Sequence, residues 1–261
     1  MSYKIGSLNI QRRYHLPKEE YKRDFFGFIS DFIKREHVEI LVLQEVLKEE
    51  ELVRLLKRLP EFWVGGFGGT TGWDFAILWD SRTVSERSKQ GTPALYEHFS
   101  NRIKRNPLLG RFIRKGIYAE LRIVDVHLWQ SDEEIRREEC GLVTGELHDK
   151  IDVHRYANSE FRGTFTLVVG DYNYSMEDCN DITHQIGNPN VITIQEELTS
   201  LKKDSDGYSS SYDHFSFNQR KNNTVPYKVS RVDAVKDYFN GDYRKYKECV
   251  SDHVPVVLEI Y

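Results

Sequence analysis

The sequence has few cysteines and no long apolar run. Its three cysteines, Cys140, Cys179 and Cys249, are an odd number at wide spacings, and no two of them form a CxxC pair. This pattern excludes a disulfide framework and offers no zinc or redox motif, and it is typical of reduced thiols. No segment approaches the roughly 18 apolar residues of a membrane span, and the start at Met1–Lys4 does not resemble a signal peptide. We therefore expect a soluble, cytoplasmic protein.

The sequence also lacks a strong charge of one sign. The formal net charge of the 261 residues is −4, so the whole molecule does not attract polyanions as a strongly basic chain would. Residues 102–115 differ, because this segment carries six basic residues and no acid. A basic run of this kind occurs on solvated surfaces about as often as in phosphate sites. It supports a nucleic-acid substrate only together with other features.

No internal repeat, low-complexity tract or proline-rich linker divides the chain, so we predict a single domain over residues 1–261. Apolar runs predict strands, and apolar residues at helical spacing predict helices. The predicted strands are Tyr3–Ile10, Val38–Leu43, Phe75–Trp79, Tyr118–Leu128, Phe165–Val169, His214–Phe217, Lys228–Val235 and Val254–Ile260, and the predicted helices are Glu19–Arg35, Glu49–Leu59 and Asp132–His154. Many strands with few helices between them predict mixed sheets.

The segment Gly65–Gly72 is the most glycine-dense part of the sequence. It lacks the glycine order of GxxxxGK[ST] and of GxGxxG, which are the two common phosphate-binding loops. We therefore predict a mobile loop here and not a phosphate site.

Polar residues stand at the ends of six predicted strands. They are Asn9, Gln44-Glu45, His127, Gly170–Asn173, Tyr212-Asp213-His214 and Asp252-His253. In open α/β sheets ligands bind at strand ends, so these residues are predicted to converge on one site. An acid beside an imidazole, as in Asp252-His253, suits metal-assisted hydrolysis.

Seven short motifs follow one another between residues 7 and 256. They are SLNI (7–10), LQEV (43–46), RNPLLGRF (105–112), VDVHL (124–128), VVGDYN (168–173), SSYDHFSF (210–217) and SDHVPV (251–256). In this order they resemble the endonuclease/exonuclease/phosphatase superfamily, and its deoxyribonuclease I branch in particular. The resemblance implies a four-layer α/β sandwich in which two mixed β-sheets pack face to face between layers of helices. It also implies a phosphodiesterase that uses Mg²⁺ or Mn²⁺.

By this resemblance Glu45 is the main metal ligand, and Asp252 and Asn9 are further ligands. Mg²⁺ prefers carboxylate and water oxygens, and it needs only one or two protein carboxylates where the substrate phosphate supplies the rest. The resemblance assigns Asp171 and Asn173 to the catalytic group. It leaves open whether one metal ion binds or two.

The resemblance also places His127 and His253 on either side of the scissile phosphate. Imidazoles suit proton transfer because they titrate near neutral pH. His253, oriented by Asp213, is assigned to water activation or transition-state stabilisation, and His127 is assigned to general acid catalysis. The sequence does not decide which imidazole is the acid. Asp233, in SRVDA, is the alternative partner for His253, although it lies closer to Asp252 in the sequence than the family pattern suggests.

Arg105 and Arg111 occupy the position of the family's Arg-x-Pro segment, and we predict that they bind the substrate phosphate or hold the active-site loop. The alternative is an exposed basic loop. Asp74 lies near the position of the family's acidic partner for the first histidine. Asp125 stands where the family often has asparagine, and the tryptophan-rich signature of abasic-site endonucleases is missing. Both departures argue against abasic-site repair.

Three functions are compatible with these motifs. The first is a nuclease acting on DNA or RNA, and the second is a phosphatase or phosphodiesterase for a small or lipid phosphate ester. The third is a catalytically silent binding module. The third is disfavoured because every expected catalytic position is filled: Glu45, His127, Asp171, Asp252 and His253.

Overall fold

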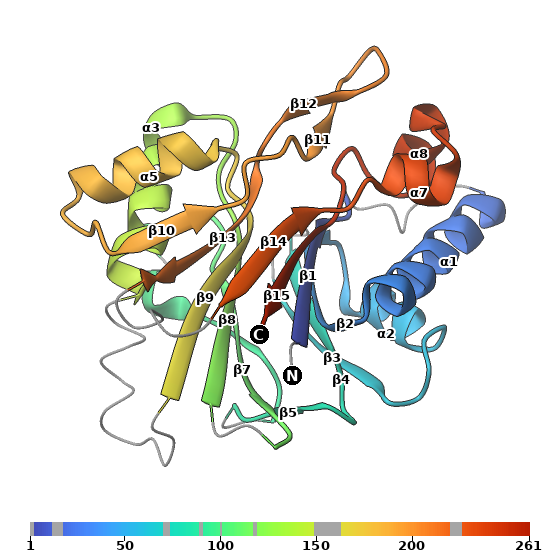
Figure 1. Cartoon of the computed structure of the whole chain (residues 1–261), viewed down its shortest axis with the longest axis horizontal. Helices are drawn as coiled ribbons and strands as arrows, with labels where there is room; N and C mark the ends of the chain where they lie inside the picture. Colours follow the sequence, from blue (N-terminus) through green and yellow to red (C-terminus); the bar gives the residue numbers. More distant parts are fainter. Residues whose placement is uncertain are drawn as a thin grey trace.

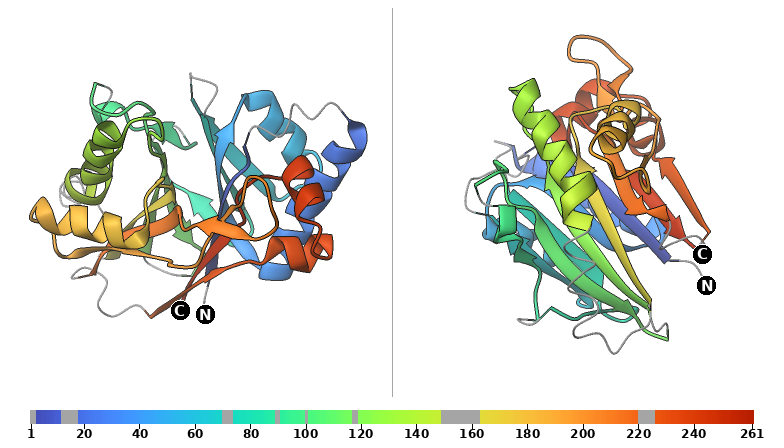
Figure 2. Two further views of the ribbon diagram at one scale, coloured as in Figure 1. Left: turned by 90° about the horizontal axis from the view of Figure 1, so that it is seen from above. Right: turned by 90° about the vertical axis from the view of Figure 1, so that its left-hand side faces the viewer.

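The computed structural model describes residues 3–11, 18–69, 74–88, 91–99, 101–116, 119–148, 163–219 and 226–261. Two large mixed β-sheets pack face to face, and helices cover the outer face of each sheet (Figures 1 and 2). The predicted four-layer α/β sandwich is therefore confirmed. None of the described helices combines the length and the apolar character needed to cross a membrane.

Sheet A has six strands. In spatial order they are β14 (Tyr227–Arg231), β15 (Val256–Ile260), β1 (Tyr3–Asn9), β2 (Val38–Val46), β4 (Asp74–Asp80) and β3 (Trp63–Gly68). Sheet B has seven, in the order β10 (Val191–Ile194), β13 (Asp213–Asn218), β9 (Gly163–Asp171), β8 (Ala119–His127), β7 (Leu108–Arg114) and β5 (Val84–Glu86), with β6 (Ala94–Leu95) paired to β7. The pairs β1–β2 and β8–β9 are parallel, and the hydrogen bond between Asn9 and Asp171 shows that both pairs end at the same edge of the sandwich.

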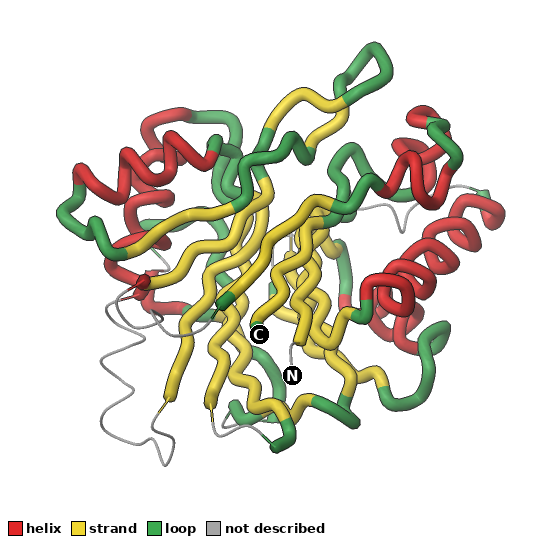
Figure 3. Tube along the Cα trace, in the orientation of Figure 1, coloured by secondary structure: helices red, strands yellow, loops and turns green. Residues whose placement is uncertain are grey.

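The helices lie on the two outer faces, as Figure 3 shows in red. On sheet A lie α1 (Glu19–Glu36), α2 (Glu49–Leu56), α7 (Ala234–Phe239) and α8 (Tyr243–Cys249), and on sheet B lie α3 (Glu133–Gly141) and α5 (Met176–Gln185). A two-stranded hairpin of β11 (Ser200–Leu201) and β12 (Tyr208–Ser210) projects from the top of the molecule in Figure 1.

Three apolar layers hold the sandwich together, one between the sheets and one under each set of helices. In β2, Ile40 and Val42 face the layer between the sheets, whereas Leu41 and Leu43 face the helices. Successive side chains of a strand point to opposite faces. The run VEILVL is apolar at nearly every position because both faces of β2 are buried.

Two predicted segments end in a different kind of structure. The predicted strand Lys228–Val235 stops at Arg231, because Asp233 accepts a hydrogen bond from the backbone N–H of Lys236 and caps α7. The predicted helix Asp132–His154 begins as expected, capped by Asp132, but changes to a π-helix over Leu142–Glu146. Residues 149–154 lie outside the described residues.

The prediction of a mobile loop at Gly65–Gly72 was wrong over Gly65–Gly68, which belong to β3. A Cβ atom on Gly66 would lie 2.5 Å from Pro93, and one on Gly68 would lie 2.4 Å from Leu108. These glycines therefore let β3 approach neighbouring segments closely. Residues 70–72 lie outside the described residues.

All three cysteines are buried and free, as predicted. Burial raises the pKa of the Cys179 thiol well above its usual value and the pKa of Cys249 to about 11. Neither thiol therefore has the thiolate character that a nucleophile or metal ligand requires.

Gly170 precedes Asp171 at the end of β9 and has a φ of +143°. A Cβ atom here would lie 2.0 Å from the carbonyl oxygen of Val126 on the paired strand β8. Gly170→Ala is therefore expected to lower the free energy of unfolding by about 3 kcal/mol, measured by urea denaturation. Gly27→Ala is the control, because Gly27 is exposed in α1 with nothing within 4 Å of its Cβ position. It should stabilise by about 0.5–1 kcal/mol, and equal stability of the two variants would contradict the strand contact.

Candidate active site

Buried polar residues lie at the edge of the sandwich where β1, β8 and β9 end, which is the upper edge in Figure 1. In β9, Leu167 faces this layer, and Asp171 lies four residues on and so has the same orientation. The same two-residue period places Asn9 and His127 at the ends of β1 and β8, and Asp213 at the start of β13. These four side chains converge because each continues an apolar face of its strand.

Glu45 also lies in this site, but the two-residue period of its strand does not explain its orientation. The two-residue period would point it toward the helices with Leu43. The register of β2 against β4 shifts between Gln44 and Val46, however, and Glu45 has a φ of +59°. This bulge turns Glu45 into the site, and Val46 resumes the helix-facing set.

The amide of Asn9 joins two buried carboxylates. Its Nδ2 donates to Glu45 Oε1 and to Asp171 Oδ2, both at 3.0 Å. Its Oδ1 accepts from the backbone N–H of Gln11 at 2.9 Å, and Gln11 Nε2 donates to Asp252 Oδ2 at 2.9 Å. Gln11, which has a φ of +48°, was not predicted as a site residue. Its position just beyond the polar end of the first strand could have indicated that it belongs to the site.

Both histidines direct Nε2 toward one carboxylate oxygen. His253 Nδ1 lies 2.8 Å from Asp213 Oδ2, and its Nε2 lies 3.7 Å from Asp171 Oδ2. His127 Nε2 lies 3.7 Å from the same Asp171 oxygen and 3.8 Å from Glu45 Oε1. The Nε2 atoms of both imidazoles therefore lie close to the same oxygen of Asp171.

Asp233, the alternative partner for His253, is engaged elsewhere. It caps α7 and accepts a hydrogen bond from the Tyr208 hydroxyl at 2.5 Å. The structure pairs His253 with Asp213, which matches the choice made from the sequence.

The buried charges shift the pKa values of the site. Burial raises the pKa of Glu45 above its usual value and the pKa of Asp171 to about 7. Burial by itself lowers the pKa of His253, but Asp213 and Asp171 outweigh it and hold that pKa well above its usual value. His253 is therefore an imidazolium at neutral pH. The site still has more carboxylates than cations, which favours a bound positive charge.

Asn173 and Arg105 bind the backbone next to the clustered side chains. Asn173 donates its backbone N–H to Asp171 Oδ1 at 2.9 Å and its Nδ2 to the carbonyl of Leu128 at 3.0 Å. Arg105 Nη1 donates to the carbonyls of His127 at 2.9 Å and Leu128 at 3.2 Å. Both residues hold the segment that follows His127. For Arg105 these contacts fit the second of its two predicted roles, and phosphate binding by Arg105 stays a prediction.

Arg111 does not join the cluster. It lies in the middle of β7, where Nη2 and Nε bind the two carboxylate oxygens of Glu120 at 2.7 and 2.9 Å. No strand was predicted in the basic segment 102–115, which contains β7. The register of β7 on β8 places Arg111 opposite Arg122, five residues before His127 on β8. Asp74, considered as a partner for His127, begins β4, and that role stays a prediction.

No three His, Cys, Asp or Glu side chains among the described residues are arranged to enclose a metal ion. The site nevertheless presents oxygen donors and excess negative charge, which fit a hard cation that keeps most of its waters. Glu45 and Asp252 are the acidic donors that would hold it. Asn9 fits less well as a ligand, because its carbonyl oxygen already accepts from Gln11 and its NH₂ group faces two carboxylates.

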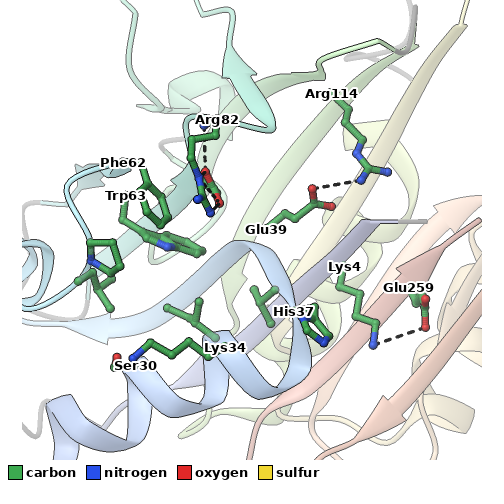
Figure 4. Close-up of a pocket in the computed structure, with 15 residues that line it drawn as sticks. Lys4, Ser30, Lys34, His37, Glu39, Phe62, Trp63, Arg82, Arg114 and Glu259 are labelled. Carbon is green, nitrogen blue, oxygen red and sulfur yellow. Dashed lines mark hydrogen bonds and ion pairs between the residues drawn. The ribbon is translucent and has the colours of Figure 1, made fainter. Parts of the chain in front are cut away.

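A cavity of about 660 Å³ lies at the opposite edge of sheet A and contains none of the clustered residues. Figure 4 shows ion pairs among its lining residues, including Arg114 with Glu39 at 3.2 Å and Lys4 with Glu259 at 3.7 Å. Lys4 lies near the start of β1, whereas Asn9 ends it. Converging chemical groups, and not cavity size, therefore identify the candidate site.

Asp125 lies two residues before His127 and faces the layer between the sheets. Gln44 Nε2 donates to its Oδ1 at 2.6 Å, and its Oδ2 has no hydrogen-bond partner among the described residues. Burial raises the pKa of Asp125 well above its usual value. Ionised Asp125 is thus a cost to the folded state.

Asp125→Asn is therefore expected to stabilise the protein in a pH-dependent way. The folded pKa is raised, so the wild type loses stability as pH rises from about 4 to that folded pKa. The neutral amide lacks this loss, and the variant should gain about 1–2 kcal/mol at pH 8 and little at pH 4. Urea denaturation at several pH values measures the difference, and a gain independent of pH would contradict the ionisation.

Comparisons with known proteins identify the fold. No family model and no curated protein matches the sequence. Among solved structures, a humanized TDP2 of D. rerio matches with a TM-score of 0.68 and 16% identity, covering 100% of this chain and 99% of that chain. An endonuclease/exonuclease/phosphatase family protein from Bacteroides thetaiotaomicron matches with a TM-score of 0.66 and 15% identity, covering 100% and 95%.

The 2′,3′-cyclic phosphatase ANGEL2 is similar to the same extent. Its TM-score is 0.66 at 14% identity, with 100% of this chain and 95% of that chain covered. At such identities the likeness shows the fold. The chain has the fold of the endonuclease/exonuclease/phosphatase superfamily, as its ordered motifs predicted.

Proposed function

We propose that this chain is a divalent-metal-dependent phosphodiester hydrolase that acts on nucleic acid. The observation that carries the proposal is the convergence of Glu45, Asp171 and two imidazoles from separate segments of the chain, with both Nε2 atoms 3.7 Å from one oxygen of Asp171. A D. rerio TDP2 complexed with a single-stranded DNA product has the same fold at a TM-score of 0.66 and 14% identity. This similarity supports the choice of nucleic acid.

Hydrolysis of a phosphodiester needs an oriented water, stabilisation of the developing charge and a proton for the leaving oxygen. Asp171 Oδ2 lies 3.7 Å from the Nε2 atom of each imidazole, and this carboxylate would orient the water and accept its proton as the new bond to phosphorus forms. His253, oriented by Asp213, is placed to donate to a non-bridging phosphate oxygen. His127 would protonate the leaving oxygen as its bond to phosphorus breaks. A Mg²⁺ or Mn²⁺ ion held by Glu45 and Asp252 would neutralise charge on the phosphate.

The first test is cleavage of supercoiled plasmid, single-stranded DNA and RNA by the purified protein with Mg²⁺, Mn²⁺ or EDTA. Cleavage should require the metal. Intact substrates under every metal condition would overturn the proposal.

A small phosphate ester is the second candidate substrate. Arg111, one of the two arginines predicted to bind phosphate, is paired with Glu120 on the neighbouring strand β8, so it brings no unpaired positive charge to the site. A mannosyl-6-phosphatase of Bacteroides thetaiotaomicron has the same fold, with a TM-score of 0.66 and 14% identity. Release of inorganic phosphate from sugar or nucleotide monoesters, without nucleic-acid cleavage, would favour this candidate.

The cytoplasmic location and the single domain over residues 1–261 stay predictions.

A further inference from the structure

Trp129 lies two residues beyond His127 and has no place in the apolar layers of the protein. Its side chain is partly exposed, and it belongs to none of the three buried clusters that the described residues form. The guanidinium carbon of Arg105 lies 5.2 Å from the centre of the Trp129 ring. A large aromatic ring left at the edge of a site, and not in the core, is available to a ligand.

The backbone beneath this ring is held in place. The N–H of Trp129 donates to Glu139 at 2.7 Å, and the same carboxylate accepts from the N–H of Lys104 at 2.6 Å. The carbonyl of Leu128 accepts from both Arg105 and Asn173. These bonds connect residues 128–129 to three other segments of the chain, so the backbone that carries the ring is firmly held two residues from His127.

We propose that Trp129 is a stacking platform for an unpaired base of the substrate next to the scissile phosphate. The proposal rests on the function proposed above and adds a preference for single strands. An aromatic face with a nearby guanidinium is the usual means of holding bases without reading their sequence. In a duplex each base is paired and stacked inside the helix, so its face is not available to the indole.

Stacking, and not charge, is the interaction that the local residues favour. Asp132, Glu133 and Glu134 follow Trp129 closely at the start of α3 and would repel a second phosphate. Arg136 is the nearby cation that could bind such a phosphate, but its Nη1 donates to the carbonyl of Gln130 at 2.5 Å. Trp129 should therefore recognise the base and not the backbone beside it.

The test compares three substrates with Mg²⁺: single-stranded oligothymidylate, the same strand in a duplex, and a single strand of tetrahydrofuran units that lack bases. Trp129→Ala should lower kcat/KM on the single strand about 10-fold, mainly through KM. It should not change cleavage of the duplex or of the baseless strand. Trp129→Phe should retain most of the activity. Tyr227→Ala is the matched control, because Tyr227 is 41% exposed on the edge strand β14.

Equal losses on the single strand and on the baseless strand would show that Trp129 only supports the site, and would overturn the stacking role. If the wild type cleaves none of the substrates, the proposed nuclease function fails separately. Binding then tests the platform by fluorescence anisotropy of the labelled single strands with Ca²⁺. Tighter binding of oligothymidylate than of the baseless strand, lost in Trp129→Ala, would support it, and no difference would overturn it.

Discussion

Replacing His253 with alanine is expected to lower kcat/KM for phosphodiester cleavage about 1,000-fold. The imidazole is buried against Asp213 Oδ2 at 2.8 Å and directs Nε2 toward Asp171. Its removal takes away the cation placed to stabilise charge on the phosphate. Steady-state cleavage of a labelled oligonucleotide with Mg²⁺ measures the loss, and KM should change little.

Two further variants show whether this loss is specific to the His253 imidazole. His184→Ala removes an exposed imidazole in α5 and should leave kcat/KM unchanged. Asp213→Asn keeps the side-chain volume but removes the negative charge that raises the pKa of His253. It should lower activity less than His253→Ala does and weaken it most at high pH. If His253→Ala, shown to be folded by circular dichroism, were as active as His184→Ala, the assigned role would be wrong.

Glu45→Gln is expected to abolish metal binding while making the metal-free protein more stable. Burial raises the pKa of Glu45, so above its folded pKa the ionised side chain lowers stability, and a neutral amide avoids this loss. Without metal, the variant should gain about 1 kcal/mol in free energy of unfolding at pH 8. Mn²⁺ should raise the melting temperature of the wild type but not of the variant. Cleavage should fall at least about 100-fold.

The opposite signs of these two effects separate metal binding from misfolding. A damaged fold would lower both stability and activity, whereas loss of a ligand lowers activity and raises metal-free stability. Glu177→Gln is the matched control, because Glu177 is exposed in the first turn of α5 and should change neither quantity. Equal Mn²⁺-dependent stabilisation of wild type and Glu45→Gln would show that the ion binds elsewhere.

The sequence by itself determined the fold class and most residues of the candidate site. The strands with two buried faces are visible as continuous apolar runs, because each face packs against its own apolar layer. A polar residue that follows such a run on the face between the sheets must lie at the rim of that layer. This reasoning brings Asn9, His127 and Asp171 together, and the structure does the same.

Only the tertiary structure decided the remaining parts of the site. The orientation of Glu45 depends on a bulge between β2 and β4, and a bulge arises from the pairing of two distant segments. The choice between Asp213 and Asp233 depends on which one meets His253 across the sandwich. Arg111 was misplaced because its partner, Glu120, lies on the neighbouring strand. Local periodicity records which face of a strand a residue occupies, but pairing between strands decides what that residue meets there.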